Sequence, residues 1–138
     1  MPAPPDPTDA DSPADFRESL LSRGILENED AALTPLTGGV SSEIYRVEDG
    51  GRFFVIKRAL EKLKVESDWY ADVSRNRTEQ EFIRYLAAFR PDAAPRLLAA
   101  DDDTGCFCME FLDGFANWKE ELLAGRCETA PAETAGGL

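Results

Sequence analysis

The chain has 138 residues, of which 43% are hydrophobic, and it carries a formal net charge of -12. This size and apolar content suit one domain with a single core and exclude a disordered polypeptide. The negative charge disfavours nucleic acids and anionic membranes as partners unless a local basic stripe compensates for it. The two densest basic runs, 58–64 and 75–84, are interleaved with acidic residues, which is typical of solvated faces.

The cysteines and the hydropathy pattern indicate a cytoplasmic protein. Cys106, Cys108 and Cys127 are an odd number, and no apolar signal segment opens the chain, so a secreted disulfide framework is not expected. A Cys-x-Cys pair with one distant cysteine and no histidine lacks the four ligands of a structural zinc site. We therefore expect buried strand thiols and no metal. No apolar run reaches the ~20 residues that a membrane span needs.

Two segments precede the first expected strand. Residues 1–11 are rich in Pro, Asp and Ala and are predicted to form a disordered tail, because they cannot bury enough apolar surface to offset their ordering entropy. Ser12, Pro13 and Asp15 supply an N-cap, a first-turn proline and a capping-box acid. They predict a short amphipathic helix that ends at Gly24.

The next segments predict three antiparallel strands. The first begins near residue 33 and leads into a glycine turn at 38–42, and the second covers 44–48. The turn 49–51 has two glycines that accept positive φ, and a third strand, 52–58, follows it directly. Alternation places Phe53, Val55 and Lys57 on one face of this strand and Phe54 and Ile56 on the other.

The second half of the chain predicts a helix and two more strands. After a connection over 59–74, the apolar positions predict an amphipathic helix from about 75 to 89 that two prolines stop. Strands are expected at 96–100 and 106–111. The acidic turn between them lacks the other ligands of an EF-hand loop, so it is predicted to be solvated and not to bind calcium. The apolar stripe of the helix is predicted to be Phe82, Ile83, Leu86 and Phe89.

Beyond a break at 112–116, two short helices are expected. Asn117 can cap one that Gly125 closes. Thr129 begins another that the remaining chain is too short to complete at the typical length of ~11 residues, so we expect the chain to be truncated.

An inward carboxylate on the 75–89 helix is the expected partner of Lys57. Glu79 lies three, four and seven residues before apolar positions of the predicted stripe and shares their face. A charge left unpaired in a low-dielectric interior costs several kcal/mol, so the two inward groups should meet. Glu81 remains the alternative partner, although its helical phase points it further from the stripe.

This order of motifs resembles the N-terminal lobe of the aminoglycoside phosphotransferase family, which includes choline kinase-like and methylthioribose kinase-like enzymes. The resemblance covers about residues 33–138. The stretches that carry it are Gly38–Val47, Val55–Lys57, Arg77–Glu81 and Met109–Gly114. Two further stretches, 64–69 and 118–122, are most similar to the methylthioribose kinase-like branch.

The resemblance implies an α+β fold, a protein-kinase-like N-terminal lobe in which one helix packs on a five-stranded antiparallel sheet. This lobe, with its leading helix, would cover 12–111, a hinge 112–116, and the start of a helical second lobe 117–138. The implied function is to bind ATP for transfer of its γ-phosphate to a hydroxyl of a small-molecule acceptor. The resemblance implies that the backbone amides of Gly39, Val40, Ser41 and Ser42 close over the phosphates, that Lys57 holds the α- and β-phosphates, and that Glu79 fixes the Lys57 ammonium in place. It also implies that Ile44 and Val55 cover the adenine, that Glu110 and Leu112 meet its edge through main-chain carbonyl and amide, and that Met109 lies at the back of the pocket.

The sequence departs from this family pattern in two places. The glycine turn lacks the full Gly-x-Gly-x-x-Gly of protein kinases, as the family's usually does. No His-x-Asp-x-x-x-x-Asn segment follows, and the chain has no histidine at all. In the family the second lobe supplies the catalytic aspartate, the asparagine and the Mg²⁺-binding aspartate, so we expect no catalytic residue here and Mg²⁺ only together with that lobe.

Two alternatives remain open at the level of sequence. One is a stand-alone, non-catalytic module that binds a nucleotide or a partner. The other is a folding-deficient fragment, because the surface that faces a second lobe would expose apolar side chains. The acceptor, the choice between ATP and GTP, and the oligomeric state are not specified by the sequence.

Overall fold

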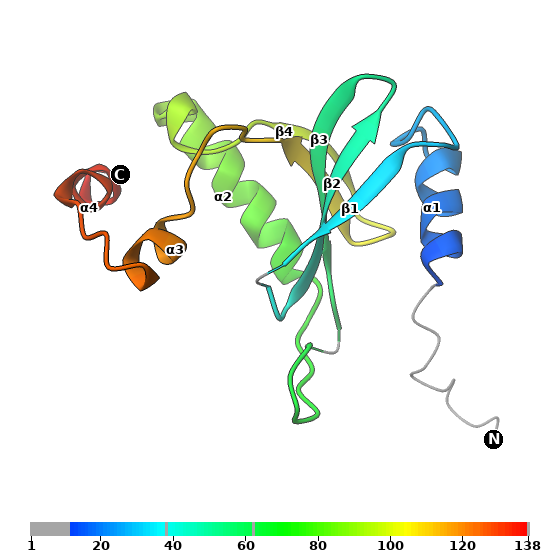
Figure 1. Cartoon of the computed structure of the whole chain (residues 1–138). Coiled ribbons are helices and arrows are strands. Elements are labelled where there is room, and N and C mark those ends of the chain that lie inside the picture. The colour runs from blue at the N-terminus through cyan, green and yellow to red at the C-terminus, as the bar shows by residue number, and fades with distance from the viewer. Residues whose placement is uncertain (1–11, 38, 62, 138) are drawn as a thin grey trace.

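The computed structural model describes residues 12–37, 39–61 and 63–137, and within these ranges it is an α+β protein with four α-helices and one five-stranded antiparallel sheet (Figure 1). The order of strands across the sheet is β1-β2-β3-β5-β4. The strands are β1 (Ala32–Leu36), β2 (Ser42–Asp49), β3 (Arg52–Ala59), β4 (Leu97–Asp101) and β5 (Cys106–Glu110). The helices are α1 (Pro13–Ser22), α2 (Arg75–Phe89), the 3₁₀ turn η1 (Pro91–Ala93), α3 (Trp118–Leu123) and α4 (Thr129–Gly136).

The start of α1 confirms the predicted capping box. The Ser12 hydroxyl accepts a hydrogen bond from the Asp15 amide at 3.2 Å, and the Asp15 carboxylate accepts one from the Ser12 amide at 3.1 Å. The helix ends at Ser22, and Gly24 follows with a φ of +69°. The tail predicted at 1–11 lies outside the described residues.

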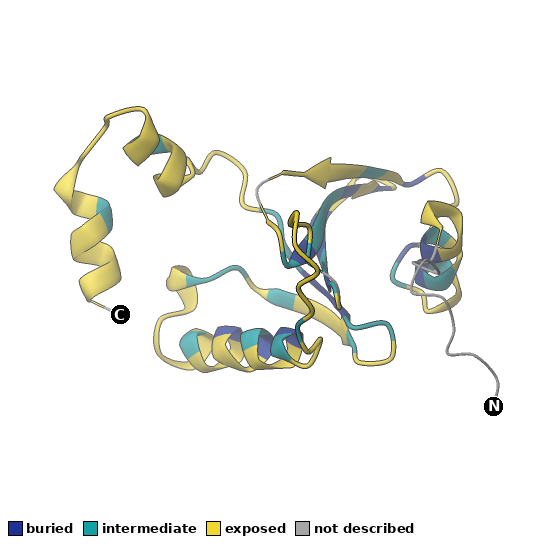
Figure 2. Cartoon of the chain, turned by 90° about the horizontal axis from the view of Figure 1, so that it is seen from below, coloured by how far each residue is buried: buried dark blue, intermediate teal, exposed yellow. Residues whose placement is uncertain are grey.

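One face of the sheet packs against α1 and forms the apolar core. Phe16 and Leu20 of α1 meet strand residues that include Val47, Phe54 and Ile56. Cys106 and Cys108 of β5 lie in the same cluster. The sequence predicted one helix on the sheet, whereas α1 and α2 flank it on opposite sides (Figures 1 and 2).

The other face of the sheet carries α2, which contacts β3, β4 and β5. The predicted stripe of this helix is only half right: Ile83 is buried and Leu86 is half-buried, whereas Phe82 and Phe89 are 58% and 66% exposed. Asn76 and Gln80 are buried as well, so the inner face is shifted toward these polar residues. A tertiary contact accompanies this shift, since the side-chain amide of Asn76 donates a 2.6 Å hydrogen bond to the main-chain carbonyl of Gly105 in the β4–β5 turn.

The C-terminal helices lie to the side of the sheet and contribute little to its core. Asn117 caps α3 as predicted, with its side chain accepting a hydrogen bond from the Lys119 amide at 3.0 Å. Neither α3 nor α4 contains a buried residue, and Figure 2 shows both as mostly exposed. None of the helices in the described ranges is long and apolar enough to cross a lipid bilayer.

A fully buried carboxylate connects the segment after α1 to the β2–β3 turn. Asp49 accepts hydrogen bonds from the Glu27 amide at 2.7 Å, the Asn28 amide at 3.2 Å and the Asn28 side chain at 2.7 Å. Arg52 adds a charge-assisted bond at 2.8 Å. The backbone hydrogen bond from Glu27, with the bond from Asn28, holds the pKa of Asp49 below its ordinary value.

We predict that Asp49→Asn destabilises the chain at neutral pH by about 2 kcal/mol, because an amide cannot accept all of these bonds. The contribution of the carboxylate is complete above the ordinary aspartate pKa, near 4, and is lost as the pH falls through the lower folded-state value. Urea unfolding of both proteins from pH 7 to pH 2 measures the difference. Asp102→Asn, at an exposed position, is the control. A gap between wild type and Asp49→Asn that stays constant with pH would contradict the assignment.

Candidate functional site

The most distinctive polar contact on the α2 face of the sheet is an ion pair between Lys57 and Glu79. The Lys57 Nζ lies 2.7 Å from both carboxylate oxygens of Glu79. The lysine side chain is 18% exposed and the glutamate 39%. The predicted pairing is therefore confirmed. The alternative partner, Glu81, instead lies 3.5 Å from Arg77 on the solvent side of the helix.

The register of the sheet explains why Lys57 points toward α2. On β3, Lys57 is directly opposite Ile44 of β2 and Phe107 of β5, and directly opposed residues share a face. Phe107 is fully buried, so the lysine stem runs along apolar surface while its ammonium reaches Glu79 on α2. An ammonium has three N–H donors and Glu79 accepts two, which leaves one donor for a ligand.

The glycine turn before β2 lies over the same face as Lys57. A Cβ placed on Gly39 would approach Ile44 Cδ1 at 4.0 Å, and Ile44 is the cross-strand neighbour of Lys57. Gly38, also predicted for this turn, is outside the described residues.

The hydrogen bonds of this turn leave its amides available. The carbonyls of Val40 and Ser41 accept bonds from the Lys64 amide at 2.8 Å and the Leu60 amide at 3.0 Å. Among the described residues, none accepts a hydrogen bond from the amides of Gly39, Val40 or Ser41. Successive free amides in a tight turn form a concave site that suits an anion.

The residues predicted to surround an adenine are only partly brought together. Val55 and Met109 are cross-strand neighbours, and both lie on the same face of the sheet as Lys57 and Ile44. Glu110 is predicted to act through its main chain; its amide donates to the Arg96 carbonyl at 2.9 Å, and its carboxylate accepts from the Arg96 amide at 3.2 Å. Leu112 is 43% exposed just beyond β5.

The sequence interpretation missed a guanidinium and aromatic group at the far end of this face. The Arg46 Cζ lies 5.1 Å from the ring centroids of both Phe53 and Phe111, and Asp113 completes a pocket of about 330 Å³. The alternation of β3 already placed Phe53 on the Lys57 face. Nothing in the sequence connected it to Arg46 and Phe111, which come from two other segments.

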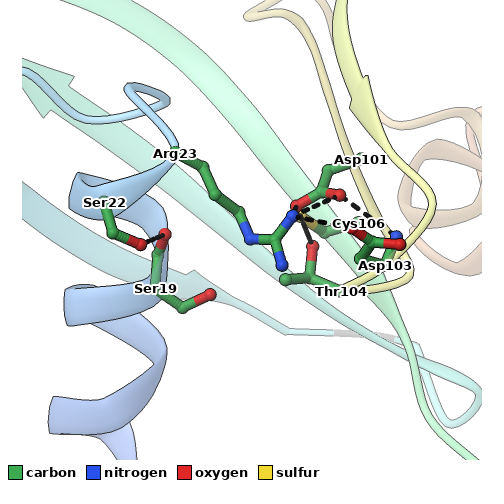
Figure 3. Close-up of polar contacts among 7 residues, drawn as sticks. All are labelled: Ser19, Ser22, Arg23, Asp101, Asp103, Thr104 and Cys106. Atoms are coloured by element: carbon green, nitrogen blue, oxygen red, sulfur yellow. Dashed lines mark hydrogen bonds and ion pairs between the residues drawn. The ribbon is translucent and has the colours of Figure 1, made fainter.

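A pocket of about 500 Å³ lies on the opposite face of the sheet, between the end of α1 and β4. Arg23 lines it and is held by carboxylates at the β4–β5 turn, at 2.8 Å from Asp101 and 3.3 Å from Asp103 (Figure 3). Thr104 donates to Asp101 at 2.8 Å and contacts the Cys106 sulfur at 2.9 Å. This network joins α1 to the sheet.

The acidic turn is only partly solvated, which corrects the sequence prediction. Asp103 is 83% exposed, whereas Asp101 is 14% exposed and is held by Arg23. Burial opposes ionisation of Asp101, but hydrogen bonds from Thr104 and Asp103 and the charge of Arg23 outweigh it and lower its pKa. Across the described ranges, no group of three or more His, Cys, Asp or Glu residues is placed to hold a metal ion.

No protein-family model matches the sequence, and no curated protein matches it.

The burial of two of the three cysteines predicts that the thiols differ in their reactivity toward alkylating reagents. Cys106 and Cys108 are buried in β5, as expected from the sequence, and burial raises the pKa of Cys108 to about 12. Cys127 is exposed. At pH 8, iodoacetamide should modify Cys127 in the folded chain and the other two only after unfolding, because the thiolate is the reactive form. Peptide mapping by mass spectrometry measures this. Modification of Cys108 at the rate of Cys127 in the native chain would contradict the burial of this strand.

Proposed function

We propose that this chain is the nucleotide-binding lobe of an ATP-dependent phosphotransferase that acts on a hydroxyl of a small molecule. The observation that carries the proposal is the ion pair between Lys57 and both oxygens of Glu79, on the sheet face that the glycine turn overlies. A strand lysine fixed by a helix glutamate beneath a glycine turn is the arrangement with which kinases hold the phosphates of ATP.

The residues present fit the charge of a triphosphate. The third N–H of Lys57 lies at the same end of the sheet as the amides of Gly39, Val40 and Ser41, from which none of the described residues accepts a hydrogen bond. In a protein of net charge -12, such a local group of donors is needed to attract an anion. Ile44, Val55 and Met109 extend an apolar surface from this point for the adenine, under the same proposal.

The proposal assigns the binding of nucleotide to this chain and the transfer step to a second lobe. The sequence has no histidine and no His-x-Asp-x-x-x-x-Asn segment, and the described residues offer no cluster of carboxylates for Mg²⁺. The exposed aromatic rings of Phe82 and Phe89 support a covering lobe, because the flank of α2 that presents them also carries Glu79.

A second candidate is a stand-alone module that binds a nucleotide or a protein partner without catalysis. The contact between Tyr85 and Phe89, both exposed on α2 with centroids 4.9 Å apart, favours it as an aromatic patch for a partner. The two candidates share the nucleotide site. They differ in whether the coding sequence downstream of this chain encodes the His-x-Asp segment.

Lys57→Ala should weaken binding of a non-hydrolysable ATP analogue about 10- to 100-fold, because a charge-assisted bond to phosphate is lost. Isothermal titration calorimetry at fixed ionic strength measures the affinity. Lys119→Ala removes an equal charge from an exposed position on α3 and should leave the affinity unchanged. Equal losses in both variants would show that only net charge matters and would remove Lys57 from the site.

Glu79→Gln should reduce affinity for ATP about tenfold while adenosine affinity stays the same, because the ammonium of Lys57 loses its fixed position below the phosphates. Glu81→Gln, on the exposed side of α2, should change neither affinity. The ratio of ATP to adenosine affinity in each variant is the measurement. The opposite ranking of the two variants would contradict the assigned pair.

A further inference from the structure

Arg75, the first residue of α2, contacts three separate segments of main chain. Its Nη1 donates to the Asp72 carbonyl at 2.7 Å, and its Nη2 donates to the Leu60 carbonyl at 2.6 Å and to the Ser41 carbonyl. Ser41 belongs to the glycine turn, 34 residues earlier in the chain. Glu79 lies one helical turn after Arg75. One guanidinium therefore joins the glycine turn to the helix that holds Lys57.

We propose that Arg75 is a positioning residue that sets the placement of the glycine turn over Lys57. The consequence for nucleotide binding rests on the proposed function, whereas the contact with the turn does not depend on it. Both guanidinium Nη atoms are engaged by main-chain carbonyls, so Arg75 acts through the turn.

Arg75 acts on the glycine turn through the Ser41 carbonyl. This carbonyl accepts hydrogen bonds from both the Leu60 amide and the Arg75 guanidinium, which occupies both of its lone pairs. The peptide plane between Ser41 and Ser42 is thereby fixed, because a peptide unit is planar. The neighbouring plane is held by the bond from the Lys64 amide to the Val40 carbonyl, so the Ser41 amide must point away from Lys64.

Arginine is the residue type that this contact requires. A guanidinium has five N–H donors in a rigid planar fork, and two of its arms here reach carbonyls on separate segments. The ammonium of lysine is a compact point charge on a flexible stem and cannot span the same carbonyls with one fixed geometry. The Arg75→Lys variant therefore keeps the positive charge but loses the planar set of guanidinium donors.

Hydrogen exchange in the nucleotide-free chain tests the contact with the turn. The reporters are the amides of Leu60 and Lys64, which donate to the two carbonyls of the turn, and the reference is the amide of Val47 in the central part of the sheet. In Arg75→Lys, exchange at Leu60 and Lys64 should accelerate at least about tenfold relative to Val47. Arg77→Lys, at a solvent-exposed position of the same helix, is the matched control and should change none of them.

Nucleotide affinity tests the consequence for binding. Arg75→Lys should lower the affinity for ATP about tenfold and leave the affinity for adenosine unchanged. The proposal is overturned if exchange at Leu60 and Lys64, relative to Val47, is the same in Arg75→Lys as in the wild type. If the wild type binds ATP, an unchanged ratio of ATP to adenosine affinity in Arg75→Lys also overturns it. If the wild-type chain binds no ATP, the proposed function fails, and the exchange measurement still decides whether Arg75 holds the turn. An equal acceleration at Val47 would report global destabilisation, whereas acceleration confined to Leu60 and Lys64 reports loosening of the turn.

Discussion

The ion pair between Lys57 and Glu79 connects α2 to β3 with an N–O distance of 2.7 Å. Of the three buried residues of this helix, Asn76 and Gln80 are polar and Ile83 is apolar. Three contacts fix the rotation of the helix about its axis and its distance from the sheet. They are the ion pair, the hydrogen bond from Asn76 to Gly105 and the contacts of Arg75. A partly buried ion pair adds little net stability, because desolvation offsets much of its attraction. We infer that the main role of the ion pair is to position α2 on the sheet.

The two faces of the sheet have different tasks in this interpretation. The α1 face supplies the apolar core, with Phe16, Leu20 and Ile56 fully or nearly buried. The α2 face presents the charged pair of Lys57 and Glu79 and the buried polar side chains of Asn76 and Gln80, which hydrogen bonds or ion pairs must compensate. A pocket of about 500 Å³ lies on the α1 face, but the Arg23 guanidinium that lines it is already held by two carboxylates. This pocket therefore lies apart from the proposed nucleotide site.

Much of the candidate site could be predicted from the sequence because it depends on local geometry. The alternation of β3 gave the face of Lys57, and helical phase selected Glu79 over Glu81. The contacts of Arg75 and the stacking of Arg46 could not be predicted. Each joins segments far apart in the chain through side chains long enough to reach many alternative partners.

The sequence by itself determined where helices and strands begin, which residues share a face, and which charges must find partners, because capping, φ preferences and periodicity act within a few residues. Only the tertiary structure decided which flank of α2 is buried and that α1 covers the opposite side of the sheet. Phe82 shows the limit, since its periodicity predicted burial and it is 58% exposed. Burial is settled by surfaces that distant strands bring together, and these surfaces exist only once the sheet has formed.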